Sequence, residues 1–117
     1  MKNLFCLAVI FSFLMISTTS YSTQYYTLEK YNVIFLNQIH VIKFVQMLEA
    51  DQESATNYQN DLIKNRYAFQ NFTELIVYKV ESFFPNPNLQ AFRLKTRDGK
   101  DIGWVIGEFG LKRIQEK

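Results

Sequence analysis

The chain has 117 residues, of which 48% are hydrophobic, 16% aromatic and 21% charged. This balance is typical of one small globular domain, and 4 glycines and 2 prolines are too few for a collagen-like or low-complexity chain. The formal net charge is only +2, which argues against nucleic acid as a partner because phosphate binding relies on concentrated positive charge.

The N-terminal segment has the three-part pattern of a secretory signal peptide. Lys2 precedes an apolar run over residues 4–16, and small polar residues follow that run. As a helix the run would be about 20 Å long, shorter than the roughly 30 Å of bilayer hydrocarbon, so we expect cleavage and no stable membrane anchor. Small residues favour cleavage after Ser22 or after Ser20. The sequence therefore predicts a signal peptide over residues 1–22 and one small domain over residues 23–117, secreted from the cell or periplasmic in a bacterium.

Side chains for metal or cofactor chemistry are scarce. Cys6, the only cysteine, is removed with the signal peptide, so the mature chain can form no disulfide, and His40 is the only histidine. This composition argues against zinc and copper sites, and we predict no cofactor, no metal site and no catalytic residue. One alternative stays open, a hydrolase in which Glu49, Asp51 or Glu53 acts together with His40.

The first part of the mature chain predicts a helix. The segment Tyr31–Leu36 fits a buried strand and the start of an apolar helix equally well, which leaves an extra N-terminal strand open. In Gln38–Ala50, polar residues recur every two or three positions, and Val41, Val45 and Leu48 form a helical stripe. We therefore expect a helix over Gln38–Ala50.

The polar stretch Asp51–Asn65 continues this region, either as part of one long helix or as the second of a bent pair. Thr56 and Gln59, three residues apart, predict a capping box at its start. Its buried stripe would consist of Ala55, Tyr58 and Leu62.

The second half of the chain predicts three antiparallel strands. Leu75–Val80 is rich in β-branched residues, and the two prolines of Phe83–Asn88 predict the end of that strand. Ala91–Arg97 and Asp101–Phe109 flank Asp98-Gly99, the strongest short hairpin signal in the chain. The predicted fold class is α+β, with one or two helices followed by a three-stranded antiparallel β-meander.

The register of this hairpin decides where Trp104 lies. A two-residue turn places Arg93 opposite Trp104, whereas a bulged three-residue turn shifts the pairing by one residue and moves the indole. In the first register the indole shares a face with alternating basic residues. We predict that this face binds the partner and consists of Arg93, Lys95, Arg97 and Lys100 together with Trp104.

Two further patterns concern the surface. Asn71-Phe72-Thr73 is an acceptor sequence for N-glycosylation, so Asn71 is a predicted glycosylation site if the organism is a eukaryote. Residues 31–45 contain a single charged side chain, that of Lys43, and predict a core segment, with a homodimer interface as the alternative.

The run from Phe92 to Val105 joins an alternating strand, an Asp-Gly turn and the tripeptide Gly-Trp-Val. It resembles the distal hairpin of bacterial SH3-like domains, a resemblance that implies a small barrel binding peptides or cell-wall polymers. The size, the export signal, the helix and the following meander are similar to cystatin-like inhibitors, although the Gln-Val-Val-Ala-Gly motif of their inhibitory hairpin is absent.

These patterns favour a small secreted protein without catalytic activity that recognises a protein or polymer partner through its surface. The alternatives are an SH3-like or cystatin-like binding or inhibitor module, and the carboxylate-dependent hydrolase. The partner itself stays unidentified at this level.

Overall fold

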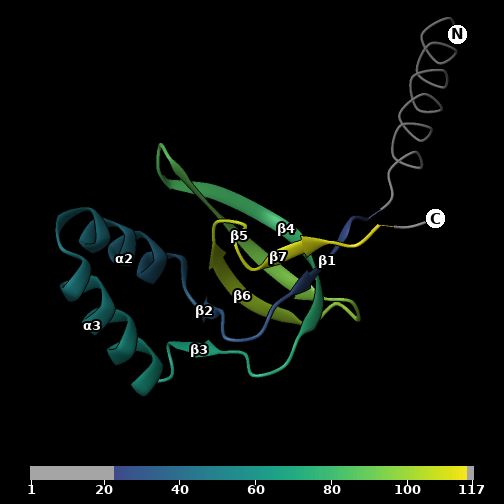
Figure 1. Ribbon diagram of the computed structural model, residues 1–117, viewed down its shortest axis with the longest axis horizontal. Helices are drawn as coiled ribbons and strands as arrows, with labels where there is room; N and C mark the ends of the chain where they lie inside the picture. Colours follow the sequence, from purple (N-terminus) through teal and green to yellow (C-terminus); the bar gives the residue numbers. More distant parts are fainter. Residues whose placement is uncertain (1–22, 116–117) are drawn as a thin grey trace, which may run out of the picture.

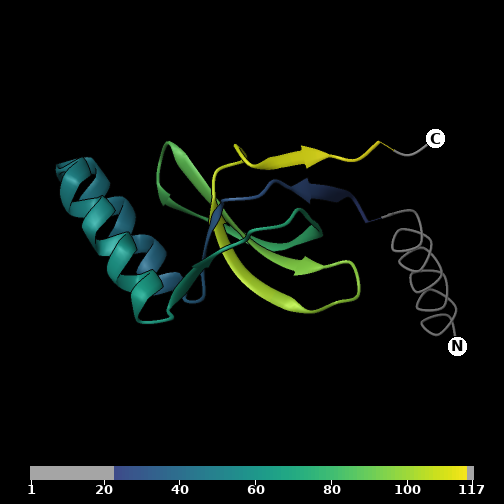
Figure 2. The ribbon, with the colours of Figure 1, turned by 60° about the horizontal axis from the view of Figure 1, so that its bottom comes forward.

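The computed structural model describes residues 23–115, so the predicted signal peptide and Cys6 lie outside the described residues. Within this range the chain forms β1 (Tyr25–Leu28), β2 (Val33–Phe35), α2 (Gln38–Ala50), α3 (Gln52–Lys64), β3 (Ala68–Gln70), β4 (Leu75–Asn86), β5 (Leu89–Thr96), β6 (Asp101–Ile106) and β7 (Leu111–Arg113). The strands join in one antiparallel sheet in the order β3-β2-β6-β5-β4-β1-β7. The two helices lie side by side at one end of this sheet, and β1 and β7 lie at the other (Figures 1 and 2).

The sheet is curled because a short connection joins two strands that are far apart in its order. Residues 29–32 connect β1 to β2, yet β6, β5 and β4 lie between these two strands. In a flat sheet the two strands would be about 19 Å apart. The connection contains a turn at Tyr31, where φ is +69°, and cannot extend that far. The edges of the sheet therefore bend toward each other.

The curl divides the hydrophobic core into two clusters. The inner cluster fills the concave side of the sheet with residues from every strand except β3: Leu28, Ile34, Val77, Phe92, Leu94, Val105 and Leu111. The outer cluster lies between the convex side and the helices: Phe35, Val41, Leu62, Ala68, Ala91 and Trp104. Neighbouring residues of a strand point to opposite faces, so Ile34 and Phe35 contribute to different clusters.

Close approach of β2 to β6 requires a glycine. Gly103 has a φ of +127°, and a Cβ atom there would lie 2.6 Å from the carbonyl oxygen of Phe35. A side chain at this position would therefore push β2 away from the centre of the sheet.

Asn71 ties together the loops at which the curled sheet closes. Its Oδ1 atom accepts a hydrogen bond from the Asn32 backbone N–H at 2.8 Å, and its Nδ2 atom donates to the carbonyls of Glu29 at 2.8 Å and Thr73 at 3.0 Å. The Glu29 N–H donates in turn to the Gly110 carbonyl, just before β7. Side-chain and backbone bonds thus link the ends of β1, β3 and β7.

The predicted helix Gln38–Ala50 is confirmed with the same bounds, and the following region is a separate helix. The break is at Asp51, whose extended backbone, with φ −162° and ψ 114°, ends α2 and begins α3. The Asp51 side chain accepts hydrogen bonds from the Glu53 N–H and the Ser54 hydroxyl. The predicted capping box at Thr56 is therefore wrong, because Asp51 already caps the helix and Thr56 lies inside it, where its hydroxyl donates to the Gln52 carbonyl.

This cap predicts a pH-dependent loss of stability in Asp51→Ala. The hydrogen bonds from Ser54 and Glu53 hold the pKa of Asp51 below its ordinary value. A carboxyl with a lowered pKa in the folded state stabilises the protein above its unfolded pKa, and this contribution disappears as the pH falls through the folded value. Thermal unfolding should show a lower midpoint for Asp51→Ala at pH 7 and a smaller difference near pH 2. Asp61→Asn, also on α3, is the control; an equal loss at both pH values would contradict the role of the charge.

The prediction of a three-stranded meander is wrong, although the α+β class holds. The described chain has a seven-stranded antiparallel sheet, and β1, β3 and β7 were not predicted. These strands have 4, 3 and 3 residues, too few for a periodic pattern, and form by pairing with distant segments. The ambiguous segment Tyr31–Leu36 contains strand β2, which is the extra N-terminal strand.

The prolines do not end β4 where the sequence predicted. Strand β4 continues through Pro85 to Asn86. Its pairing with β1 covers only Leu75–Tyr78, so the later residues of β4 pair with β5 alone. A proline lacks an N–H but is tolerated where one side of a strand is unpaired.

Both predicted registers of the Asp98-Gly99 hairpin are present in part. Far from the turn, Arg93 pairs with Trp104 and Leu94 with Gly103, as the two-residue turn predicts. Next to the turn, Lys95 pairs with Asp101, and the register shifts between Leu94 and Lys95. A bulge between Leu94 and Lys95 therefore allows the longer turn and the pairing of Arg93 with Trp104 to occur in the same hairpin.

Candidate functional site

Trp104 belongs to the core rather than to the exposed face. Its side chain is only 5% exposed and lies in the outer cluster, under the helices. The Phe83 ring packs edge-on against the indole, with ring centroids 5.1 Å apart. Trp104 does share a face with Arg93, but the helices cover its half of that face. The indole is consequently unavailable to a partner in the folded protein.

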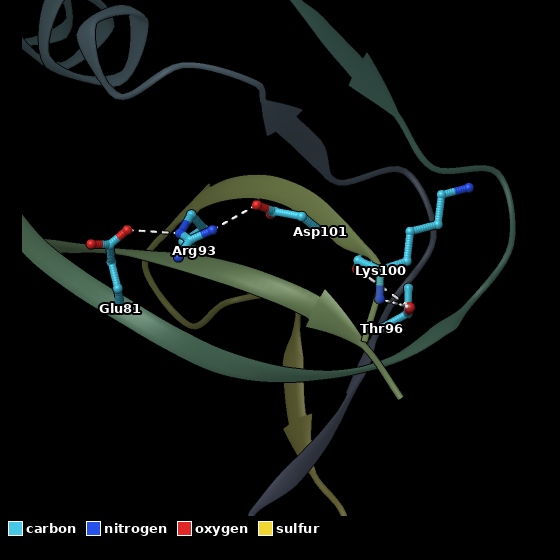
Figure 3. A network of polar contacts seen from close by, with 5 residues as sticks. All are labelled: Glu81, Arg93, Thr96, Lys100 and Asp101. Carbon is cyan, nitrogen blue, oxygen red and sulfur yellow. Dashed lines mark hydrogen bonds and ion pairs between the residues drawn. The ribbon is translucent and has the colours of Figure 1, made fainter. Parts of the chain in front are cut away.

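Arg93 lies at the border between the covered and uncovered halves of this face and is held by two carboxylates. Its Nε atom donates to Glu81 at 2.7 Å and its Nη1 atom to Asp101 at 2.6 Å, and these contacts span three adjacent strands (Figure 3). The hydrogen bond that Arg93 donates to the Glu81 carboxylate is the main cause that raises the pKa of Arg93. A register shift between Lys79 and Glu81 places Glu81 opposite Arg93. The charge of Arg93 is therefore largely neutralised by carboxylates of the two neighbouring strands.

Lys95 and Arg97 lie beside two tyrosines on the uncovered half of the convex face. Tyr25 pairs with Tyr78, and Tyr78 with Lys95, so the three side chains form a row across β1, β4 and β5. The tyrosine rings meet edge-on at 5.9 Å, and the Arg97 guanidinium lies 5.2 Å from the centre of the Tyr25 ring. We call Tyr25, Tyr78, Lys95 and Arg97 the tyrosine-basic face. The strand segments that carry it, in β1, the start of β4 and the end of β5, lie at the opposite end of the sheet from the helices (Figure 2).

The cations of this region are less neutralised than Arg93. Among residues 23–115, no carboxylate lies within ion-pair distance of Lys95, Arg97 or Lys100. The Lys100 ammonium extends away from the Arg93 network, while its backbone N–H donates to the Thr96 hydroxyl at 3.1 Å (Figure 3). Asp98 at the turn accepts a hydrogen bond from Thr96, which lowers the pKa of Asp98. The turn is thus fixed by its own polar contacts, while Arg97 and Lys100 are exposed and Lys95 is half-buried.

The residues of the hydrolase alternative do not form one site. Asp51 caps α3, and Glu49 accepts a hydrogen bond from the Asn86 amide at 2.7 Å. His40 precedes Glu49 by nine residues on the same helix, a rise of about 13.5 Å. The His40 ring packs against Tyr58 and Tyr67, and its Nδ1 atom is buried with no hydrogen-bond partner in the described part of the chain. Neither Glu49 nor Asp51 is placed to share a proton with this imidazole, and Glu53 is exposed in the first turn of α3.

The acceptor amide of the predicted glycosylation site is turned inward. Asn71 is 5% exposed, and its Nδ2 atom, to which a glycan would be attached, donates two hydrogen bonds. Phe72 and Thr73 are exposed next to it. In the folded protein the Asn71 amide therefore has a structural function.

Within residues 23–115, no group of three or more histidine, cysteine, aspartate or glutamate side chains could hold a metal ion. No helix there is both long and apolar enough to cross a membrane.

Comparisons with protein-family models, with curated proteins and with solved structures found no match to this chain. The resemblances to SH3-like domains and to cystatin-like inhibitors therefore gain no support from these searches. A seven-stranded sheet with a helix pair, within the described residues, also differs from the small barrel that the SH3-like hairpin implied.

Sequence reasoning found the basic residues of the candidate site but missed Tyr25 and Tyr78. The two tyrosines are 53 residues apart in the chain, and only the pairing of β1 with β4 brings them together. The sequence did indicate which way Tyr78 points, because in the predicted strand it lies on the opposite face from Val77 and Lys79. Nothing in the sequence indicated Tyr25 as its neighbour.

Proposed function

We propose that the protein is a small secreted recognition module without catalytic activity, which binds a partner carrying acidic groups through the tyrosine-basic face. The partner is a protein or a polymer of this chemistry. Export is supported by Lys2, the apolar run and the small residues that follow.

The observation that carries the proposal is the row of Tyr25, Tyr78 and Lys95, with Arg97 against Tyr25. Tyrosines offer large and rigid contact area, and cations next to them attract carboxylates and stack on planar groups. The helices lie at the other end of the sheet from β1 (Figure 1), and the side chains of the row are half-buried with Arg97 exposed, which leaves them accessible to a partner. Lys95 and Arg97 have no ion-pair partner among residues 23–115, which favours a partner that carries acidic groups.

The test compares binding to immobilised polyglutamate and polygalacturonate with binding to neutral dextran. The protein is purified after expression of the full chain, and the variant combines Lys95→Gln with Arg97→Gln. We expect binding to one of the acidic polymers, weaker at high salt, and a loss of about tenfold or more in the variant.

The matched control combines Lys43→Gln with Lys64→Gln, which removes the same charge from the helices. Its affinity should stay within about twofold of the unchanged protein. Equal losses in both double variants would show that net charge alone drives binding. Absence of binding to both acidic polymers would contradict the proposed class of partner.

A further inference from the structure

The concave side of the sheet holds a second feature, distinct from the tyrosine-basic face. Lys79 points to this side, where its cross-strand partner is Leu94 of the inner cluster. Its ammonium lies 3.9 Å from the centre of the Phe92 ring and 4.6 Å from that of the Tyr26 ring. The side chain is only 22% exposed. A cation is thus held between two aromatic rings at the border of an apolar interior.

An open cleft of about 450 Å³ lies next to this cation. It is formed by the β4–β5 turn and the start of β5 on one side and by the β6–β7 loop on the other, and it is lined by Asn88, Leu89, Gln90, Phe92, Gly107, Glu108 and Phe109. This volume is at the small end of the range of small-molecule sites, roughly 300–1,000 Å³. The lining offers more apolar than polar surface.

Two residues of the β6–β7 loop connect the cleft to the cation. Glu108 lines the cleft, and its Oε1 atom lies 3.3 Å from the Lys79 ammonium. Phe109 is 88% exposed, an unusual position for a phenylalanine, and also lines the cleft. An apolar ligand in the cleft would cover the exposed ring and lie against Phe92.

We propose that this cleft binds a small amphipathic anion, with its carboxylate on Lys79 and its apolar body between Phe92 and Phe109. Glu108 is the internal carboxylate that occupies Lys79 when no ligand is bound. Its side chain is 59% exposed, so water can solvate it when the ligand displaces it. Lys79, by contrast, is enclosed by aromatic rings and keeps a preference for a negative partner.

The ion pair between Lys79 and Glu108 predicts in which direction a Glu108 substitution changes the affinity for each kind of ligand. An anionic ligand competes with Glu108, so removal of that carboxylate should strengthen binding. A cationic amphiphile would instead pair with Glu108, and the same change should weaken its binding. The affinity of a ligand held by the apolar wall alone would not change when the charge of Lys79 or of Glu108 is removed.

The experiment measures binding of decanoate and decyltrimethylammonium below their micelle concentrations, and of decanol below its solubility limit, by calorimetry and by chemical-shift changes in the ¹⁵N-labelled protein. The protein is again purified after expression of the full chain. We expect decanoate to bind more tightly than the other two probes, with shift changes centred on Gln90, Gly107 and Phe109. Glu108→Gln should bind decanoate about threefold more tightly, Phe109→Ala about fivefold more weakly, and Lys79→Met about tenfold more weakly.

Methionine keeps an unbranched side chain between the two rings, so Lys79→Met tests the charge with little change in packing. Two controls use equivalent residues elsewhere. Lys112 forms an ion pair with Glu29, and Phe72 is an exposed phenylalanine in another cleft. Neither Lys112→Met nor Phe72→Ala should change the affinity for decanoate.

Three results would overturn the proposal: equal binding of decanoate and decanol, tighter binding of the cationic probe, or an equal loss in Phe72→Ala. Glu108→Gln alters an exposed side chain. It therefore keeps the test decisive if Lys79→Met should fail to fold.

Discussion

Trp104→Ala should lower the free energy of unfolding by about 4 kcal/mol, the range for removing a large aromatic side chain from a core. The indole is almost fully buried between the convex face of the sheet and the helices and packs edge-on against Phe83. Its loss would leave a cavity in the cluster that attaches the helix pair. Urea unfolding followed by circular dichroism measures the change, because Trp104 is the only tryptophan and its fluorescence disappears with it.

The control is Phe84→Ala, since Phe84 is an aromatic residue that is largely exposed. Its effect should stay within about 0.5 kcal/mol. If Trp104→Ala changed stability by less than about 1 kcal/mol, the indole would have to be exposed. Trp104 would then return to the set of residues available for binding a partner.

Asn71→Ala should lower the free energy of unfolding by about 3 kcal/mol, because it removes three hydrogen bonds and leaves the partly buried Asn32 N–H unpaired. The bonds join Asn71 to Asn32, Glu29 and Thr73. They hold a loop in which Tyr31 has a positive φ. The change should therefore also loosen the connection between β1 and β2, which amide hydrogen exchange measures at residues 29–32.

Thr73→Ala separates this structural function from glycosylation. It destroys the Asn71-Phe72-Thr73 acceptor pattern but leaves the Asn71 side chain in place. We expect Thr73→Ala to unfold at nearly the same denaturant concentration as the unchanged protein. If both variants were equally destabilised in protein from a eukaryotic host, and neither in protein from a bacterial host, an attached glycan would account for the result.

The two proposed binding regions follow from the alternation of residues along β4 and β5. Lys95 and Tyr78 point to the convex side, whereas Lys79 and Phe92 point to the concave side. Variants at the tyrosine-basic face should therefore leave decanoate binding unchanged, and variants at Lys79 should leave binding to acidic polymers unchanged.

Local sequence patterns determined those parts of the protein whose structure depends on near neighbours. The stripe of Val41 and Val45 predicted α2 with its correct bounds, because one face of a helix is defined within four residues. The alternation on either side of Asp98-Gly99 predicted a hairpin, with the pairing of Arg93 and Trp104 as one of two possible registers, because both strands are adjacent in the chain. The basic residues Lys95 and Arg97 were found in the same way.

Only the tertiary structure decided which side of each element is covered. Strands β1, β3 and β7 are too short to have a pattern of their own and exist because distant strands pair with them. Trp104 and Lys95 share a face of the sheet, but the helices cover only the half that contains Trp104. Asn71 is part of a surface motif in the sequence, and the curl of the sheet turns its amide inward. Burial depends on contacts between segments far apart in the chain, and local periodicity carries no information about those contacts.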